Sequence, residues 1–289
     1  MENYKFIEKI GRGTHGTAYL LKSYLDNKLV VCKSISSKYA KHANREINIL
    51  KRCKHKRVIR MIDFIKVSDS MYIILEYANC GTLDSMIKYY VKSAKKPPTG
   101  LVWSAISQIS DALYYLHSNS IIHRDIKPAN ILICKTTYEK TDYLEFKLCD
   151  FSLSTETKDK IENRLIVGTP YYMAPEIIEK KPYDHKIDIW SLGVILYELI
   201  NLERPFSAEN REKLYAKIVR SKIDQTKINT SDPDLNQLIK QCFLDSDKRI
   251  SSLELARNNK IRLHLTTIEL KQREIRIKEL EEKIRLLEK

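Results

Sequence analysis

The sequence predicts an α+β protein in which paired strands come first and helices follow. Residues 17–25 and 28–35 are rich in β-branched and aromatic residues, and an Asp-Asn turn signal separates them, which predicts a β-hairpin. Residues 41–53 carry apolar side chains at helical spacing. Residues 261–289 repeat apolar side chains every seven positions, which predicts a long C-terminal helix.

The composition is that of a folded protein. Its 289 residues are 43% hydrophobic and 30% charged, enough to bury one large core or two modest ones. The longest strongly apolar stretch, residues 192–200, is too short to span a bilayer, and the first ten residues lack a signal-peptide core. The six cysteines form no C-x-x-C pair, which favours reduced thiols over disulfides or zinc. We therefore expect no membrane partner and a cytoplasmic or nuclear location.

The net charge is +14, from 51 basic and 37 acidic residues, but the charges are interspersed along the chain. Nucleic acid is therefore not an expected partner, because a generic basic surface explains the same balance. The densest basic cluster is KRCKHKR at residues 51–57. It is either a patch for acidic partners or a solvated helix end and turn, and the second account is the simpler one.

Glycine residues cluster just before the first predicted hairpin. The chain has seven glycines, and three of them, Gly11, Gly13 and Gly16, fall within six residues. A G-x-G-x-x-G pattern opens both dinucleotide-binding units and kinase nucleotide loops, and a strand rather than a helix follows it here. Backbone amides in such a turn can close over phosphates because no Cβ blocks their approach. A hairpin turn without a ligand is the alternative interpretation.

The second strand carries a lysine, Lys33, that could reach phosphates beneath this turn. Between Lys33 and Arg57 the only acidic residue is Glu46, on the predicted helix that follows. A Lys and Glu pair that joins a strand to a helix fixes the lysine on nucleotide phosphates in protein kinases.

Further motifs follow in order, each suited to phosphoryl transfer. They are IIHRDIKPANILI at 121–133, CDFS at 149–152, GTPYYMAPE at 168–176 and DIWSLG at 188–193. Within them Asp125 is placed to accept the proton of a substrate hydroxyl and Lys127 to steady the γ-phosphate. Asn130 and Asp150 are candidates to hold magnesium.

With these motifs the chain resembles a eukaryotic-type Ser/Thr protein kinase over about residues 4–258. The resemblance implies a two-lobed kinase fold, with a β-rich N-lobe (1–78), a helical C-lobe (79–258) and a C-terminal helix at 261–289 that can form a coiled coil. It also implies ATP and Mg²⁺ as cofactors and proteins as substrates.

The same resemblance implies which residues form the active site. The catalytic set is Asp125, Lys127, Asn130, Lys33 and Glu46, and the metal ligands are Asn130 and Asp150. The implied nucleotide-binding residues are Ile10, Gly11, Arg12, Gly13, Thr14, His15, Gly16, Thr17, Ala18, Val31, Lys33, Glu76, Ala78 and Leu132.

Within the superfamily, the strings HRDIKPAN, VGTPYYMAPE and IDIWSLG, together with Trp103, are most similar to the NIMA-related mitotic kinases. Polo-like and autophagy-initiating kinases share several of these strings and stay open as alternatives. The resemblance implies a role in cell-cycle or mitotic control and a cytoplasmic, nuclear or spindle-associated location.

Three departures from the family pattern bear on activity. Ser152 stands where relatives have glycine, and only thirteen positions separate Lys33 from Glu46. Leu165 occupies the place where relatives carry a phosphorylatable hydroxyl, which leaves Thr157 as a candidate. We expect the helix that carries Glu46 to be held inward by default. A pseudokinase, or nucleotide-binding scaffold, is the competing class.

Two polar or amphipathic segments complete the prediction. The segment between Asn130 and Asp150 is polar and is predicted to be a surface hairpin loop. In the tail, one heptad position is held by Leu263, Leu270, Ile277 and Ile284, and the other by Thr266, Arg273, Leu280 and Leu287. This pattern fits either a homodimer through 261–289 or a helix that is solitary or packs back on its own chain.

Overall fold

The computed structural model describes most of the chain. The described residues are 2–13, 16–67, 70–138, 141–156, 161, 166–220, 223, 227–228 and 230–287.

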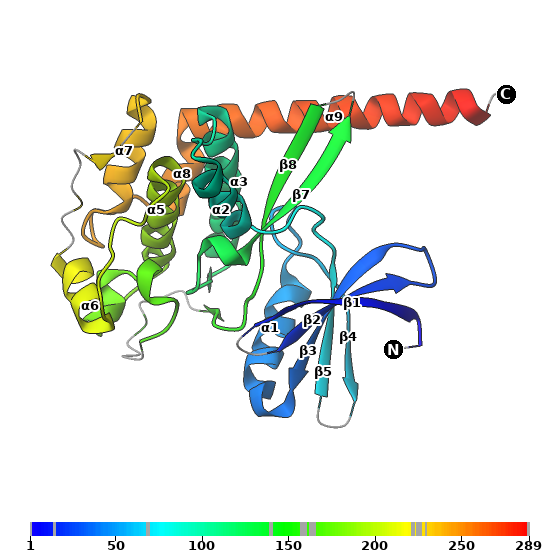
Figure 1. The fold of residues 1–289 in the computed structure, drawn as a ribbon, viewed down its shortest axis with the longest axis horizontal. Coiled ribbons are helices and arrows are strands. Elements are labelled where there is room, and N and C mark those ends of the chain that lie inside the picture. The colour runs from blue at the N-terminus through cyan, green and yellow to red at the C-terminus, as the bar shows by residue number, and fades with distance from the viewer. Residues whose placement is uncertain are drawn as a thin grey trace.

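An antiparallel sheet of five strands forms the N-terminal part (Figure 1). Its strands are β1 (Tyr4–Arg12), β2 (Thr17–Ser23), β3 (Leu29–Ser36), β4 (Met61–Val67) and β5 (Ser70–Glu76), in the order β1-β2-β3-β5-β4. A single turn of 3₁₀-helix, η1 (Ser37–Tyr39), leads from β3 directly into α1 (Ala40–Arg52). Helix α1 buries Ala43, Ile47 and Leu50 against Ile35 and Ile73 of the sheet. This packing positions Glu46, which lies on the same face of the helix.

Helices dominate the rest of the chain. They are α2 (Leu83–Ser93), α3 (Thr99–Ser118), α4 (Pro175–Ile178), α5 (Lys186–Asn201), α6 (Arg211–Arg220), α7 (Pro233–Cys242) and α8 (Ser252–Arg257). Short elements lie among them: β6 (Ile121–Ile122), η2 (Pro128–Asn130), β9 (Thr155–Glu156) and η3 (Pro170–Tyr172). Every residue of α5 from Ile187 to Ile200 is buried, so this helix is the centre of the helical core. The expected two-lobed α+β architecture is confirmed (Figure 1).

The polar segment before Asp150 is more ordered than a surface loop. It forms two paired strands, β7 (Ile131–Tyr138) and β8 (Thr141–Leu148), in unbroken antiparallel register. Ile133, Phe146 and Leu148 are buried in the main core, which explains why strands form where the sequence suggested a loop. The far end of this hairpin reaches the C-terminal helix (Figure 1).

The tail is one continuous helix, α9 (Asn259–Leu287), that begins beside α3 and α8 and runs on past the β7–β8 hairpin (Figure 1). Ile261 and Ile275 are buried, and the His264 ring stacks on Trp103 of α3 at 5.4 Å between centroids. This face differs from the predicted heptad face, whose members Leu270 and Ile277 are 54% and 55% exposed. The helix therefore packs back on the chain through one face and leaves the heptad face uncovered.

No helix within the described ranges is both long and apolar enough to cross a membrane.

Candidate active site

A cavity of about 440 Å³ lies between the sheet and the helical part. Nine of the predicted nucleotide-binding residues line it: Ile10, Gly13, Gly16, Ala18, Val31, Lys33, Glu76, Ala78 and Leu132. Gly11, Arg12 and Thr17 flank the cavity without lining it. Thr14 and His15 lie outside the described residues. The cavity wall also contains four catalytic or metal candidates, Lys33, Glu46, Asn130 and Asp150.

The glycines of the first turn differ in what they allow. A Cβ at Gly16 would lie 2.2 Å from the carbonyl oxygen of Ser34 on β3, so the close approach of these two strands requires glycine there. At Gly11 an added Cβ would meet no atom within 4 Å. Packing within the protein therefore does not explain the absence of a side chain at Gly11.

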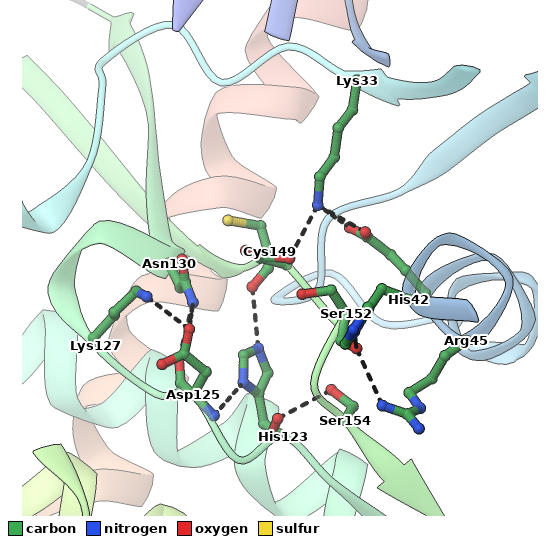
Figure 2. A network of polar contacts seen from close by, with 12 residues as sticks. Lys33, His42, Arg45, His123, Asp125, Lys127, Asn130, Cys149, Ser152 and Ser154 are labelled. Atoms are coloured by element: carbon green, nitrogen blue, oxygen red, sulfur yellow. Dashed lines mark hydrogen bonds and ion pairs between the residues drawn. The ribbon is translucent and has the colours of Figure 1, made fainter. Parts of the chain in front are cut away.

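The Lys33 ammonium lies between two carboxylates (Figure 2). It donates to both oxygens of Glu46, at 2.7 and 2.9 Å, and to Oδ1 of Asp150 at 3.0 Å. Burial alone would lower the pKa of Lys33, but the two carboxylates raise that pKa above its ordinary value. Burial alone would raise the pKa of Asp150, and the nearby Lys33 ammonium instead holds that pKa well below its usual range. Lys33 and Asp150 are therefore charged at neutral pH, whereas burial raises the pKa of Glu46 and the Lys33 ammonium opposes that rise.

Ser152 ties helix α1 to the segment that follows Asp150. Its carbonyl oxygen accepts a hydrogen bond from Arg45 at 3.3 Å and lies 3.1 Å from Nδ1 of His42 (Figure 2). Both partners are on α1, four residues and one residue before Glu46. Sequence reasoning missed these contacts, because nothing in the local pattern of residues 42–45 indicates a partner more than a hundred positions away.

The Asp125 carboxylate sits at the centre of a second polar cluster (Figure 2). One oxygen accepts from Lys127 at 2.6 Å and from Asn130 at 3.0 Å, and the other accepts from the Thr169 hydroxyl at 2.7 Å. Lys127 also donates to the Thr169 hydroxyl at 2.9 Å. A carboxylate held in this way keeps a fixed orientation.

The buried carboxylate of Asp188 holds the loop that carries Asp125 through hydrogen bonds. Asp188 accepts from the backbone N–H groups of His123 and Arg124, each at 2.9 Å, and lies 2.9 Å from Nε2 of His117. Arg124 and Asp150 adopt left-handed backbone conformations, with φ of 66° and 64°. Such conformations cost about 1–3 kcal/mol in non-glycine residues and persist where surrounding contacts enforce them.

Two side chains are suitably placed for magnesium. The amide nitrogen of Asn130 donates to Asp125, which leaves its amide oxygen for another ligand. Asp150 is ionised and pairs with Lys33 through its Oδ1 atom, and Asn130 and Asp150 both line the cavity. Oxygen donors of this kind, completed by phosphates and water, are what Mg²⁺ prefers. Within the described residues no cluster of three or more His, Cys, Asp or Glu side chains could hold a metal by itself.

The region of the expected activation segment is only partly described. Thr157, Arg164 and Leu165 lie outside the described residues. Arg124 is described, and its guanidinium donates to the carbonyl oxygen of Leu153 at 2.7 Å and to the Tyr183 hydroxyl at 3.2 Å. Protein groups therefore already satisfy Arg124 in this conformation.

Sequence reasoning missed several residues of the cavity wall. Ile59, Tyr77, Gly81 and Thr82 line it as well. Thr82 caps α2, where its side chain and that of Ser85 form a reciprocal capping box. A Gly-Thr pair directly before an amphipathic helix is a recognisable start signal, so these two positions could have been found. Ile59 carries no comparable signal, because any buried aliphatic residue would look the same.

Comparison with known proteins agrees with this geometry. The family model described as "Protein kinase domain" matches residues 4–260, and the chain belongs to the protein kinase family. The chain is 36% identical over 234 residues to the serine/threonine-protein kinase nekl-2 of Caenorhabditis elegans, an alignment that covers 77% of this chain and 64% of that protein. It is 34% identical over 249 residues to the serine/threonine-protein kinase Nek1 of Mus musculus, covering 84% of this chain and 20% of the relative.

These relatives identify the branch of the family. A further match, 37% identical over 227 residues, is the probable serine/threonine-protein kinase nek3 of Dictyostelium discoideum, which covers 76% of this chain and 20% of the relative. Among Ser/Thr protein kinases the chain is most like the NIMA-related family, as its motifs predicted. It spans less than two thirds of the length of these relatives.

Proposed function

We propose that the protein is an active, Mg-ATP-dependent Ser/Thr protein kinase. The observation that carries the proposal is the position of Lys33, which contacts Glu46 and Asp150 at the same time. In protein kinases the Lys–Glu ion pair must be in place for phosphoryl transfer, and so must the aspartate that holds Mg²⁺, the position that Asp150 occupies here. The family uses ATP and Mg²⁺ in general, and the fit of Asn130 and Asp150 supports the same cofactors here.

Each polar group has a distinct task in this proposal. Lys33 binds the α- and β-phosphates, and the glycine-rich turn between β1 and β2 covers them. Asn130 and Asp150 hold Mg²⁺, which when bound neutralises charge that develops on the phosphates. Asp125 orients the substrate hydroxyl and accepts its proton. The hydroxyl oxygen then bonds to the γ-phosphorus as the bond to the β–γ bridging oxygen breaks, and ADP leaves.

The contacts of Lys127 and Thr169 favour serine and threonine as acceptors. Both side chains lie against the Asp125 carboxylate, at 2.6 and 2.7 Å. A hydroxyl on a short side chain can approach Asp125 between them, whereas a tyrosine would need a deeper opening. We extend the proposal, from the NIMA-related branch, to a role in cell-cycle or mitotic control in the cytoplasm, nucleus or spindle.

The uncovered face of α9 supports a second partner, another copy of this chain. Leu263, Leu270, Ile277 and Ile284 repeat every seven residues along it and are 54 to 60% exposed. A second helix with the same seam would cover these side chains. The opposite face keeps α9 on its own domain, so self-association need not detach it.

Transfer of labelled γ-phosphate from ATP to casein by the purified full chain tests the proposed activity. Labelled phosphoserine or phosphothreonine that depends on added Mg²⁺ is the expected product. Nucleotide binding without any transfer would instead support the pseudokinase alternative.

A further inference from the structure

The basic cluster KRCKHKR lies outside the catalytic machinery, at the end of α1 and the turn that follows. The structure places this segment around a cavity of about 610 Å³, which it shares with Arg60 and Met61 of the β4 region and with Lys147 of β8. Glu76 lines both this cavity and the nucleotide cavity. A solvated helix end does not by itself explain why this basic segment lines a cavity.

The rim of this cavity is strongly positive. Five cations line it: Lys51, Lys54, Lys56, Arg60 and Lys147. The one carboxylate in the lining, Glu76, is already paired with Lys147 at 2.7 Å. His55 adds no charge at neutral pH, because burial lowers its pKa below the usual value. Among the described residues no acidic side chain pairs with Lys54 or Arg60, and both are exposed.

The floor of the cavity is apolar. Leu50 and Val58 are buried beneath the rim, and Met61 and Cys53 are half-buried beside them. A floor of this kind accepts an aliphatic side chain, while the rim attracts carboxylates. The only aromatic ring in the lining, that of His55, is stacked on Tyr115 at 4.6 Å between centroids and is not free to stack on a nucleobase.

A second basic cavity continues the first. It measures about 220 Å³ and is lined by Lys56, Glu269, Gln272, Arg273 and Arg276, so Lys56 belongs to both cavities. Lys56 pairs with Glu269 of α9, which is the only acidic residue in this second lining. The two cavities, joined at Lys56 between β4 and the tail helix, are together named the track.

We propose that this track is a docking groove for an acidic peptide segment with an aliphatic anchor residue, such as a segment of a protein substrate. The anchor enters the floor at Leu50 and Met61, and carboxylates on either side meet Lys54, Arg60 and Arg273. The idea that the acidic segment belongs to a protein substrate rests on the proposed kinase function. Binding of an acidic peptide to the track does not depend on catalysis.

Fluorescence anisotropy on the full chain tests the groove. The probe is a labelled peptide of about twelve residues, rich in Glu and Asp, with one central Leu. We expect Lys54→Glu with Arg60→Glu to weaken its binding at least about tenfold, and the milder Lys54→Gln with Arg60→Gln to weaken it less. The matched control, Lys240→Glu with Lys248→Glu, reverses two exposed charges in the helical part and should leave binding unchanged. Replacing the Leu of the peptide with Ser, or raising the salt concentration, should also weaken binding.

Three results would overturn the inference: no binding by the wild-type chain, wild-type binding by Lys54→Glu with Arg60→Glu, or equal binding of a peptide with Lys in place of Glu. Tighter binding of a labelled single-stranded RNA that is lost in the same variants would assign the groove to nucleic acid instead. Circular dichroism should confirm that each variant is folded. A chain that binds the peptide but transfers no phosphate would contradict the proposed kinase function and leave the groove intact.

Discussion

The Lys33 ammonium lies 2.7 Å from a carboxylate oxygen of Glu46, although only a 3₁₀ turn separates the strand of one from the helix of the other. The short connection leaves α1 little freedom to move away from the sheet. Glu46 is 1% exposed, so its charge depends on this partner.

Loss of the Lys33 ammonium should abolish most of the catalytic activity while the chain stays folded. We expect Lys33→Met to lower kcat/KM by about 100-fold or more, because a charge aimed at the phosphates is lost in a partly buried site. It should also destabilise the chain by about 3 kcal/mol, since two carboxylates are left without their cation. Steady-state kinetics and urea unfolding measure the two effects. Lys22→Met on the adjacent strand β2 is the control, and equal loss of activity in that variant would refute the assignment.

Activity should depend little on phosphorylation of the activation segment. Arg124, which the family resemblance implies as the acceptor of an activating phosphate, is already bonded to the Leu153 carbonyl and the Tyr183 hydroxyl. The contacts of Ser152 with α1 hold Glu46 inward without a phosphate. Complete dephosphorylation, confirmed by intact mass, should change the rate of peptide phosphorylation by less than about tenfold. A larger fall, reproduced by Thr157→Ala, would make Thr157 the switch instead.

Some residues of this site could be predicted from the sequence, and others could not. Lys33, Glu46, Asp125 and Asp150 could be found because each stands in a motif whose chemistry requires that residue type. The clamp of Ser152 on α1 could not be found, since a backbone carbonyl acceptor leaves no mark in the sequence. Family resemblance supplied the two lobes, whereas hydrophobic pattern alone supplied only the first hairpin, α1 and the tail.

In the tail helix the apolar pattern is present in the sequence, but it does not show which face of the helix packs against the domain. Helix α9 is apolar on two faces, and the stricter heptad at Leu270 and Ile277 stays exposed while Ile261 and Ile275 pack inward. Docking is decided by Trp103 and the β7–β8 hairpin, which come together only in the folded chain. Periodicity predicted the helix but did not select the face that packs.

Self-association should follow the exposed heptad face. We expect the full chain to form a weak dimer at micromolar concentration, and Leu270→Lys with Ile277→Lys to be monomeric, because two charges enter the apolar seam. Leu286→Lys is the matched control: this residue is 67% exposed on the same helix but off both heptad positions. Sedimentation equilibrium gives the masses. A monomeric wild-type chain, or a dimer that survives the double substitution, would exclude this seam.

Cys149 should react slowly with electrophiles although it lines the nucleotide cavity. Burial, and then the negative charge of Asp150, raises the pKa of its thiol well above the usual range. The thiolate is therefore scarce at neutral pH, and its alkylation rate should rise about tenfold per pH unit between about pH 7 and pH 9 without a plateau. Peptide-level mass spectrometry of an adenine-shaped electrophile, with and without ATP, measures this rate. A plateau near neutral pH would show that the thiol is activated.

The central claim is that Asp125 accepts the proton during γ-phosphate transfer, and Asp125→Asn tests it most directly. A positioned general base contributes roughly 10²- to 10⁴-fold, so purified Asp125→Asn should transfer labelled phosphate at least about 100-fold more slowly than the wild type. Its nucleotide affinity and its unfolding midpoint should stay close to those of the wild type. Asp142→Asn, on the exposed hairpin, should transfer phosphate normally. Transfer at the wild-type rate by folded, nucleotide-binding Asp125→Asn would contradict the account.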